Sequence, residues 1–332
     1  MLYLQNRFNA LIVNKMATAE KMKDRYGALY EKMRKTSAKI SDQSLYVYLR
    51  NLSRLYGLIH ESQVIKGDGK WLTKKELFEK YDNLDLNRKR LFSVAAVKGL
   101  KAYGMESKEW NTRLSKASES YDKQRAKRKI TSKEQEKWPA DGYKSLRKAA
   151  KEEKLLVKKS LKRKDKTLKD LLAIQNYLVL FLYSYHPIRL DFADVFVKKP
   201  EAGEKKNYLY KAKRIGWQLT LRNYKTAKFR GETVIKIDRA PSRALSMFVP
   251  ILKSVVKHEK LLSNASGNPL TRNGLSKLLT KLTKKHLGVG FSASLIRVLF
   301  STENRKLIEK AAKIQDEMGH NMKQSLAYTR KT

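Results

Sequence analysis

Cysteine is absent from this sequence, which excludes disulfide bonds and thiolate metal ligands. Histidine is scarce, and its five copies are too scattered to suggest a catalytic metal site. The most apolar run, YLVLFLYSY from Tyr177, has nine residues and is too short to cross a bilayer. No signal-peptide pattern opens the chain, and no Gly-Lys-Ser/Thr loop is available for nucleotide phosphates. We therefore expect an intracellular, non-secreted protein with no metal, no small-molecule cofactor and no membrane association.

Acidic residues are few relative to basic ones. The 332 residues include 74 Lys and Arg against 32 Asp and Glu, a formal net charge of +42. Such an excess of positive charge is self-repelling unless the protein binds a polyanion, and nucleic acid is the obvious candidate. The basic residues are spread along the whole chain, which disfavours a membrane-surface helix. A hydrophobic content of 41% indicates folded domains despite the charge.

Proline and glycine are also sparse, with six and fifteen copies, which favours a mostly helical chain. Residues 1–40 are predicted to form a basic helical arm. Apolar residues at helical spacing then predict a helix from Ser41, its expected N-cap, followed by further helices over 87–104 and 107–129. We expect a compact helical domain over residues 41–125 and a second domain over 126–332.

The second domain is predicted to combine helices with a few strands. A long, largely buried helix is expected over 167–185, and strands over 193–199, 216–223 and 232–238. The last two strands are expected to pair as a hairpin, and the chain from Ser242 onward to be helical. The predicted fold class is mainly α with a small antiparallel β-sheet.

Four segments of the second domain contain candidate site residues. YSYHPIRLDFADV contains Arg189, LRNYKTAKFRGETVIKI contains Lys225, FSASLIRVLFST contains Arg297, and MGHNMKQSLAY contains His320 and Tyr328. Each residue also has an ordinary structural interpretation. Arg189 could interact with a helix C-terminus, Lys225 could be a solvated lysine, and His320 and Tyr328 could belong to a helix end and the core. Arg297 lies between apolar residues, so it needs an anionic partner, which could be a structural ion pair.

In this order the four segments resemble the tyrosine recombinase (integrase) superfamily, which also includes type IB topoisomerases. The resemblance implies that Tyr328 is the nucleophile, that Arg189 and Arg297 clamp the phosphate, and that His320 is a general base or phosphate contact. Lys225 would be the general acid, with Lys228 as the alternative. Ser294 stands where the family carries a histidine, and we interpret it as structural, for example as a helix cap.

The resemblance extends beyond these segments. SLYVYLRNLSRLYG resembles the first helix of the family's core-binding domain, and TSKEQEKWPADGYKSL resembles recombinases of virophages and other large-DNA-virus mobile elements. It implies a two-domain clamp around double-stranded DNA, with residues 41–125 as core-binding domain and 126–332 as catalytic domain. Further DNA contacts are expected from four basic residues: Lys228, Arg230, Arg272 and Lys323.

The implied function is site-specific recombination that integrates or resolves a viral or mobile genome through a 3′-phosphotyrosyl intermediate. The family acts as a tetramer on two DNA sites, so a homotetramer on DNA is expected, in the host nucleus or a cytoplasmic viral factory. Two alternatives remain open. One is a type IB topoisomerase with the same chemistry, and the other is a non-catalytic duplex-DNA-binding protein on the same scaffold.

Overall fold

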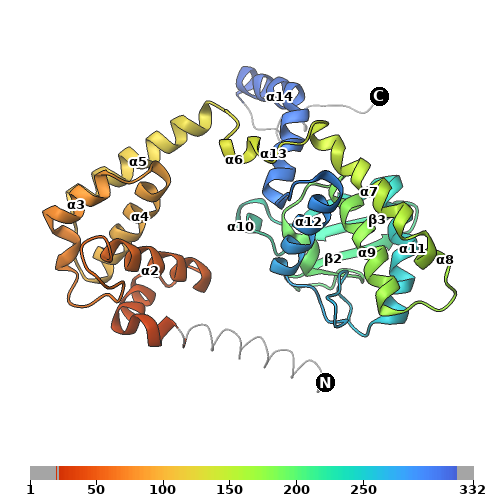
Figure 1. The fold of residues 1–332 in the computed structure, drawn as a ribbon, viewed down its shortest axis with the longest axis horizontal. Coiled ribbons are helices and arrows are strands. Elements are labelled where there is room, and N and C mark those ends of the chain that lie inside the picture. The colour runs from red at the N-terminus through yellow and green to blue at the C-terminus, as the bar shows by residue number, and fades with distance from the viewer. Residues whose placement is uncertain (1–19, 21, 320–332) are drawn as a thin grey trace. The chain divides into compact units, whose positions relative to one another are not determined.

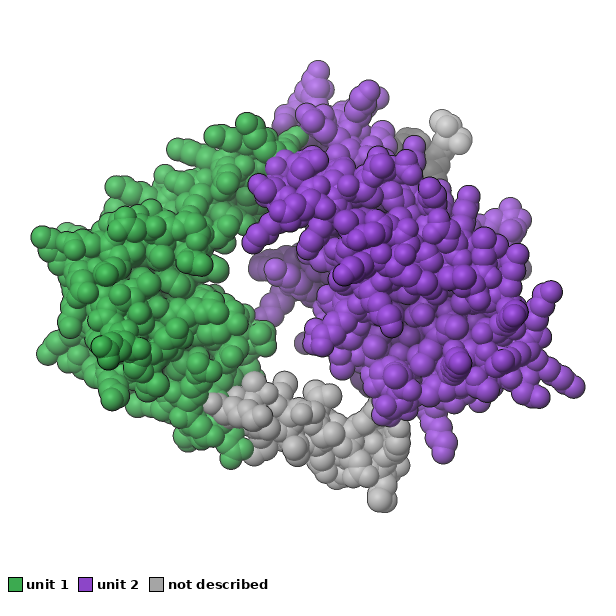
Figure 2. Space-filling view, in the orientation of Figure 1, with its two compact units in different colours: residues 1–129 green, residues 130–332 purple. Residues whose placement is uncertain are grey.

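The computed structural model describes residue 20 and residues 22–319, so His320, Lys323 and Tyr328 lie outside the described residues. The described chain is mainly helical and contains a four-stranded mixed sheet. It divides into two compact units, residues 1–129 and 130–332, which Figure 2 colours separately. Each unit has its own hydrophobic core.

The first unit is helical in its described part (Figure 1). Ser41 caps the first long helix, as predicted, because its side chain accepts a hydrogen bond from the Ser44 amide. This helix packs against the helix Leu86–Ala102 at Gly99, where an added Cβ would lie 2.9 Å from a Leu52 methyl carbon. The elements of the first unit are α2 (Asp42–Tyr56), η1 (Lys70–Thr73), α3 (Lys75–Asp82), α4 (Leu86–Ala102) and α5 (Lys108–Ala126).

The segment before α2 belongs to this core, so part of the predicted arm is not separate. Met22, Leu29 and Met33 are buried against the helices of the first unit. They recur at helical spacing and so form one apolar face among basic residues. The Arg34 guanidinium also donates to the Ile40 carbonyl and pairs with Asp42, which fixes this segment to the start of α2.

The second unit is built around one long helix, α9 (Leu168–Tyr183), which contacts α7, α11 and α12. Thr167 and Asp170 form a capping box at its start, and burial of most of its apolar side chains makes it the centre of the core. The surrounding elements are α6 (Ser132–Gln135), η2 (Gly142–Lys144), α7 (Ser145–Leu156), α8 (Lys158–Lys162), α11 (Arg239–Val255), α12 (Arg272–Leu287), α13 (Ala293–Glu303) and α14 (Arg305–Met318).

The sheet has the order β1-β2-β3-β4, and its last two strands form the predicted hairpin. Its strands are β1 (Val195–Phe196), β2 (Asn207–Ala212), β3 (Gly216–Leu221) and β4 (Thr233–Lys236). The prediction of a wholly antiparallel sheet is wrong, because β1 runs parallel to β2. The strand β2, which lies between β1 and β3, was not predicted from the sequence. The chain leaves β1, runs through residues 197–206 and returns in the same direction, so a parallel pair results.

Candidate functional site

The turn that carries Arg189 is held by two buried tyrosines. The Tyr183 hydroxyl donates to the Arg189 carbonyl over 2.8 Å, and the Tyr143 hydroxyl donates to the Tyr183 carbonyl over 2.7 Å. Burial raises the pKa of both phenols, so both stay protonated and act as donors. The Arg189 side chain is half-buried and has no carboxylate partner among the described residues.

His186 joins this turn to the end of the β3–β4 hairpin. Its Nε2 accepts a hydrogen bond from the Asp238 amide over 3.3 Å, and only 8% of the residue is exposed. Burial lowers the pKa of His186, while the nearby Asp238 carboxylate acts in the opposite direction. The neutral imidazole is the form that can accept this hydrogen bond. His186 therefore fixes the turn carrying Arg189 to the hairpin carrying Lys225.

Arg297 lies on α13, half-buried between residues of the core. No carboxylate pairs with it in the described part of the chain, so the structural ion pair considered above is not found there. Phe300, one turn further on, packs edge-on against Tyr143 with ring centroids 5.2 Å apart. Ser294 is exposed and is not the helix cap, because Ser292 accepts the hydrogen bond from the Leu295 amide. Tyr143 thus connects the helix of Arg297 to the turn of Arg189.

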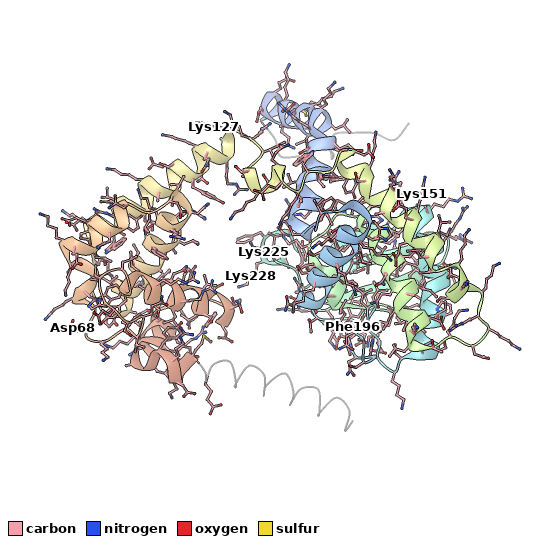
Figure 3. The ribbon with its side chains drawn as sticks, viewed as in Figure 1. Asp68, Lys127, Lys151, Phe196, Lys225 and Lys228 are labelled. Carbon is pink, nitrogen blue, oxygen red and sulfur yellow. The ribbon has the colours of Figure 1, made fainter. Side chains whose placement is uncertain are left out.

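The connection between β3 and β4 presents Lys225, Lys228 and Arg230 to solvent. Lys228 and Arg230 belong to the short helix α10 (Ala227–Arg230), and Lys225 precedes it (Figure 3). Within the described residues none of the three cations forms an ion pair. Their charges are therefore available to an anionic ligand.

Arg272 differs from the other predicted DNA contacts. Its Nη2 lies 2.8 Å from Asp191 Oδ1, and its Nε pairs with Asp194. Both carboxylates belong to η3 (Leu190–Asp194), which begins immediately after Arg189. This pairing neutralises the Arg272 charge and ties the start of α12 to the segment that follows Arg189.

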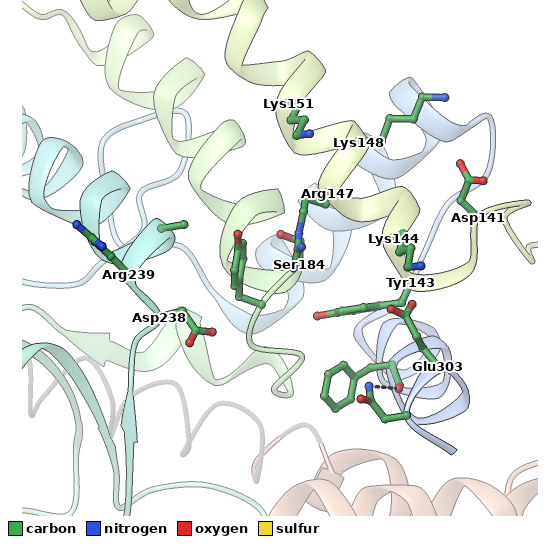
Figure 4. Close-up of a pocket in the computed structure, with 14 residues that line it drawn as sticks. Asp141, Tyr143, Lys144, Arg147, Lys148, Lys151, Ser184, Asp238, Arg239 and Glu303 are labelled. Atoms are coloured by element: carbon green, nitrogen blue, oxygen red, sulfur yellow. Dashed lines mark hydrogen bonds between the residues drawn. The ribbon is translucent and has the colours of Figure 1, made fainter. Parts of the chain in front are cut away.

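A pocket of about 1080 Å³ opens beside these elements of the second unit, since Tyr143, Asp238 and Phe300 also line it (Figure 4). Lys144, Arg147, Lys148 and Lys151 line it at helical spacing, and Arg239 adds a fifth cation. The Arg147 guanidinium lies 4.4 Å from the centre of the Tyr185 ring. Three carboxylates also line the pocket: Asp141, Asp238 and Glu303.

The structure thus connects the elements of Arg189, Arg297 and Lys225 within one compact unit, although no hydrogen bond joins these three side chains to one another in the described chain. The roles predicted for His320, Lys323 and Tyr328 fall outside the described residues. Sequence reasoning missed His186, whose place three residues before Arg189 was the available signal. It also missed Phe229, an aromatic residue between two basic ones in the hairpin connection.

Among the described residues, no cluster of three or more histidine, aspartate or glutamate side chains could hold a metal ion. None of the helices in that part of the chain is long and apolar enough to span a membrane.

No family model matches the chain, and no curated protein matches it. Among solved structures, the crystal structure of XerA recombinase aligns with 92% of this chain and 93% of its own, at 12% sequence identity and a TM-score of 0.36. A likeness of this strength carries no argument about function.

Proposed function

We propose that this protein breaks and rejoins duplex DNA through a phosphotyrosyl intermediate, as a tyrosine recombinase does. One observation supports this most. Arg189, Arg297 and Lys225 have no carboxylate partner among the described residues, while the elements that carry them are connected by hydrogen bonds and ring packing through His186 and Tyr143. Half-buried guanidiniums without anions are costly, so an external anion is the expected partner. A phosphodiester supplies that charge.

Each of the proposed site residues has a role in this reaction. The Tyr328 oxygen attacks the phosphorus in line with the bond to the leaving 5′-oxygen, forming a 3′-phosphotyrosyl bond while the P–O5′ bond breaks. Arg189 and Arg297 stabilise the negative charge that grows on the non-bridging oxygens, and they stay charged at any working pH. Lys225 donates a proton to the leaving 5′-oxygen. His320 accepts the phenolic proton or binds the phosphate, and a 5′-hydroxyl reverses the reaction.

The broader role follows from this reaction. We propose site-specific recombination of a viral or mobile genome inside the cell, with the helical first unit and the second unit binding the same duplex and four copies assembling on two sites. The unpaired lysines and arginines would contact the phosphate backbone and supply affinity without sequence information.

Covalent trapping tests the proposal. The protein is mixed with end-labelled duplexes from the termini of its own element, nicked beside each candidate site so that the released fragment diffuses away. A protein–DNA band that survives detergent is expected for the wild type and not for Tyr328→Phe. Arg297→Ala is expected to lose the band as well. Arg243→Ala removes an equal charge from an exposed position of α11 and should keep it.

Other results would redirect the assignment. A band in Tyr328→Phe identifies a different nucleophile. Relaxation of supercoiled plasmid by the monomer, with no site dependence, favours the type IB topoisomerase alternative. No band in any variant, with tight duplex binding intact, favours the non-catalytic alternative, which the serine at position 294 keeps open.

A further inference from the structure

The β3–β4 connection exposes an aromatic side chain that no part of the mechanism uses. Phe229 is 90% exposed, compared with 68% for Leu307, another strongly exposed apolar residue. Its neighbours Lys228 and Arg230 are exposed, and so is Lys225 four residues before it. An exposed phenyl ring within a group of unpaired cations is unfavourable in water and suited to a ligand that is both anionic and aromatic.

The connection that presents Phe229 is braced. The Tyr224 hydroxyl lies 2.9 Å from both the Gly231 carbonyl and Thr233 Oγ1, so it spans the loop from one side to the other. The Phe229 amide donates to the Thr226 carbonyl over 3.1 Å. Gly231 ends α10 at φ 68° and ψ −156°, a conformation that is essentially restricted to glycine. The ring therefore projects from a fixed backbone.

The base of the connection is fixed as well. Asn207, which is fully buried on β2, accepts hydrogen bonds from the amides of Arg222 and Asn223 over 3.0 and 2.8 Å. Its own amide group donates to the Asn223 carbonyl over 3.0 Å. Arg222 in turn pairs with Glu232 on the other side of the loop. These contacts anchor the tip to the sheet, so that little order has to be gained on binding.

We propose that Phe229 is a wedge that inserts between adjacent base pairs of duplex DNA from the minor groove, while Lys225, Lys228 and Arg230 contact the flanking phosphates. This inference rests on the proposed function, because it assigns to DNA the face that carries Lys225. Apolar wedges flanked by basic residues are the side chains that unstack and kink duplexes from the minor groove. Insertion would bury the ring and position Lys225 beside one particular base-pair step of the duplex.

Unstacking two adjacent base pairs costs free energy, and the cost is smaller where the bases are mismatched. Wedge insertion therefore predicts that the protein prefers a mismatched duplex to a fully paired one. Wild-type protein is expected to bind a 30-base-pair duplex with a central two-base mismatch roughly ten- to a hundredfold more tightly than the fully paired duplex. A 2-aminopurine placed beside the mismatch is expected to change its fluorescence when the protein binds, because the ring alters its stacking.

The variants are Phe229→Ala and Phe229→Trp, with Leu307→Ala as the matched control. Leu307 is also exposed but lies on α14, away from the hairpin. Phe229→Ala should bind both duplexes alike and lose the fluorescence change, Phe229→Trp should retain both signals, and Leu307→Ala should behave as wild type. Circular dichroism of each variant establishes that it is folded.

Two outcomes overturn the wedge. One is an unchanged preference and fluorescence signal in Phe229→Ala. The other is unchanged DNA binding by that variant together with a change in oligomeric state, which would assign Phe229 to a protein interface. Neither affects the covalent trapping of Tyr328, so failure of the wedge is distinguishable from failure of the proposed reaction. Wild-type protein that binds no duplex at all would overturn both.

Discussion

The Tyr183 hydroxyl makes the contact that most directly supports Arg189, and Tyr183→Phe removes it with little other change. The ring is fully buried and packs edge-on against Phe192 with centroids 5.4 Å apart, a contact that phenylalanine preserves. The Arg189 carbonyl loses its 2.8 Å hydrogen bond. Leaving such an acceptor unsatisfied costs about 1–3 kcal/mol. The turn should therefore open roughly 5- to 150-fold more often.

Amide hydrogen exchange measures this opening directly. The amides of Ser184 and His186 donate to the carbonyls of Leu180 and Leu182, so they report on the end of α9 and the turn before Arg189. Their exchange should accelerate by the factor above. DNA cleavage should fall because Arg189 is less well positioned, whereas duplex affinity should stay unchanged because no charge is lost.

Tyr210→Phe is the matched control. It removes a hydroxyl that donates to Gln218 Oε1 over 2.7 Å, between β2 and β3. This variant should leave exchange around Arg189 unaltered. Exchange in Tyr183→Phe that equals that of the wild type would refute the argument that this hydroxyl holds the turn.

Three further predictions follow from the contacts described. Burial lowers the pKa of His186, so the unfolded chain takes up a proton at this residue before the folded chain does as pH falls. The stability of the second unit should therefore be full above about pH 6.5 and decline below it. Thermal unfolding at pH 7.5 and 5.5 should show a smaller loss of stability between the two pH values in His186→Gln than in the wild type. Glu153→Gln removes the buried carboxylate that lies 2.6 Å from both Lys285 Nζ and His286 Nε2. Urea unfolding should show a loss of stability of about 1–3 kcal/mol, the cost of leaving buried partners unsatisfied. A loss below about 0.5 kcal/mol, which is typical of a surface ion pair, would contradict this. Lys228→Gln should make the negative slope of log affinity against log salt concentration shallower by about 0.9, as expected for one lost phosphate contact. An unchanged slope would show that this residue does not contact DNA.

Short-range patterns accounted for much of the fold. The apolar spacing of α2 and its cap at Ser41 depend on residues a few positions apart, so both are visible in the sequence. The β3–β4 hairpin is likewise a local pairing between neighbouring segments. The strand β2 was missed because NYLYKA is short, although it forms a tight hairpin with β3 in which Ala212 pairs with Gly216. Its pairing with β1 is parallel and has no hairpin signal in the sequence.

The site was less accessible to sequence reasoning, since charge pairing is not local. Arg272 and Asp191 are 81 positions apart, and nothing in the sequence indicates that this arginine is neutralised while Arg297 is not. The same holds for Glu153 and His286, which are separated by 133 positions. Similarly, periodicity does not reveal the Tyr224 hydrogen bonds that brace the loop carrying Phe229.

The most direct test of the central claim is to identify the residue that becomes attached to DNA. The trapped complex is digested with nuclease and trypsin, and the modified peptide is sequenced by mass spectrometry. The proposed reaction predicts a nucleotide on Tyr328, within the tryptic peptide of residues 324–330. A nucleotide on another tyrosine, or on a serine or lysine, would contradict the assignment of the nucleophile and with it the mechanism proposed for this protein.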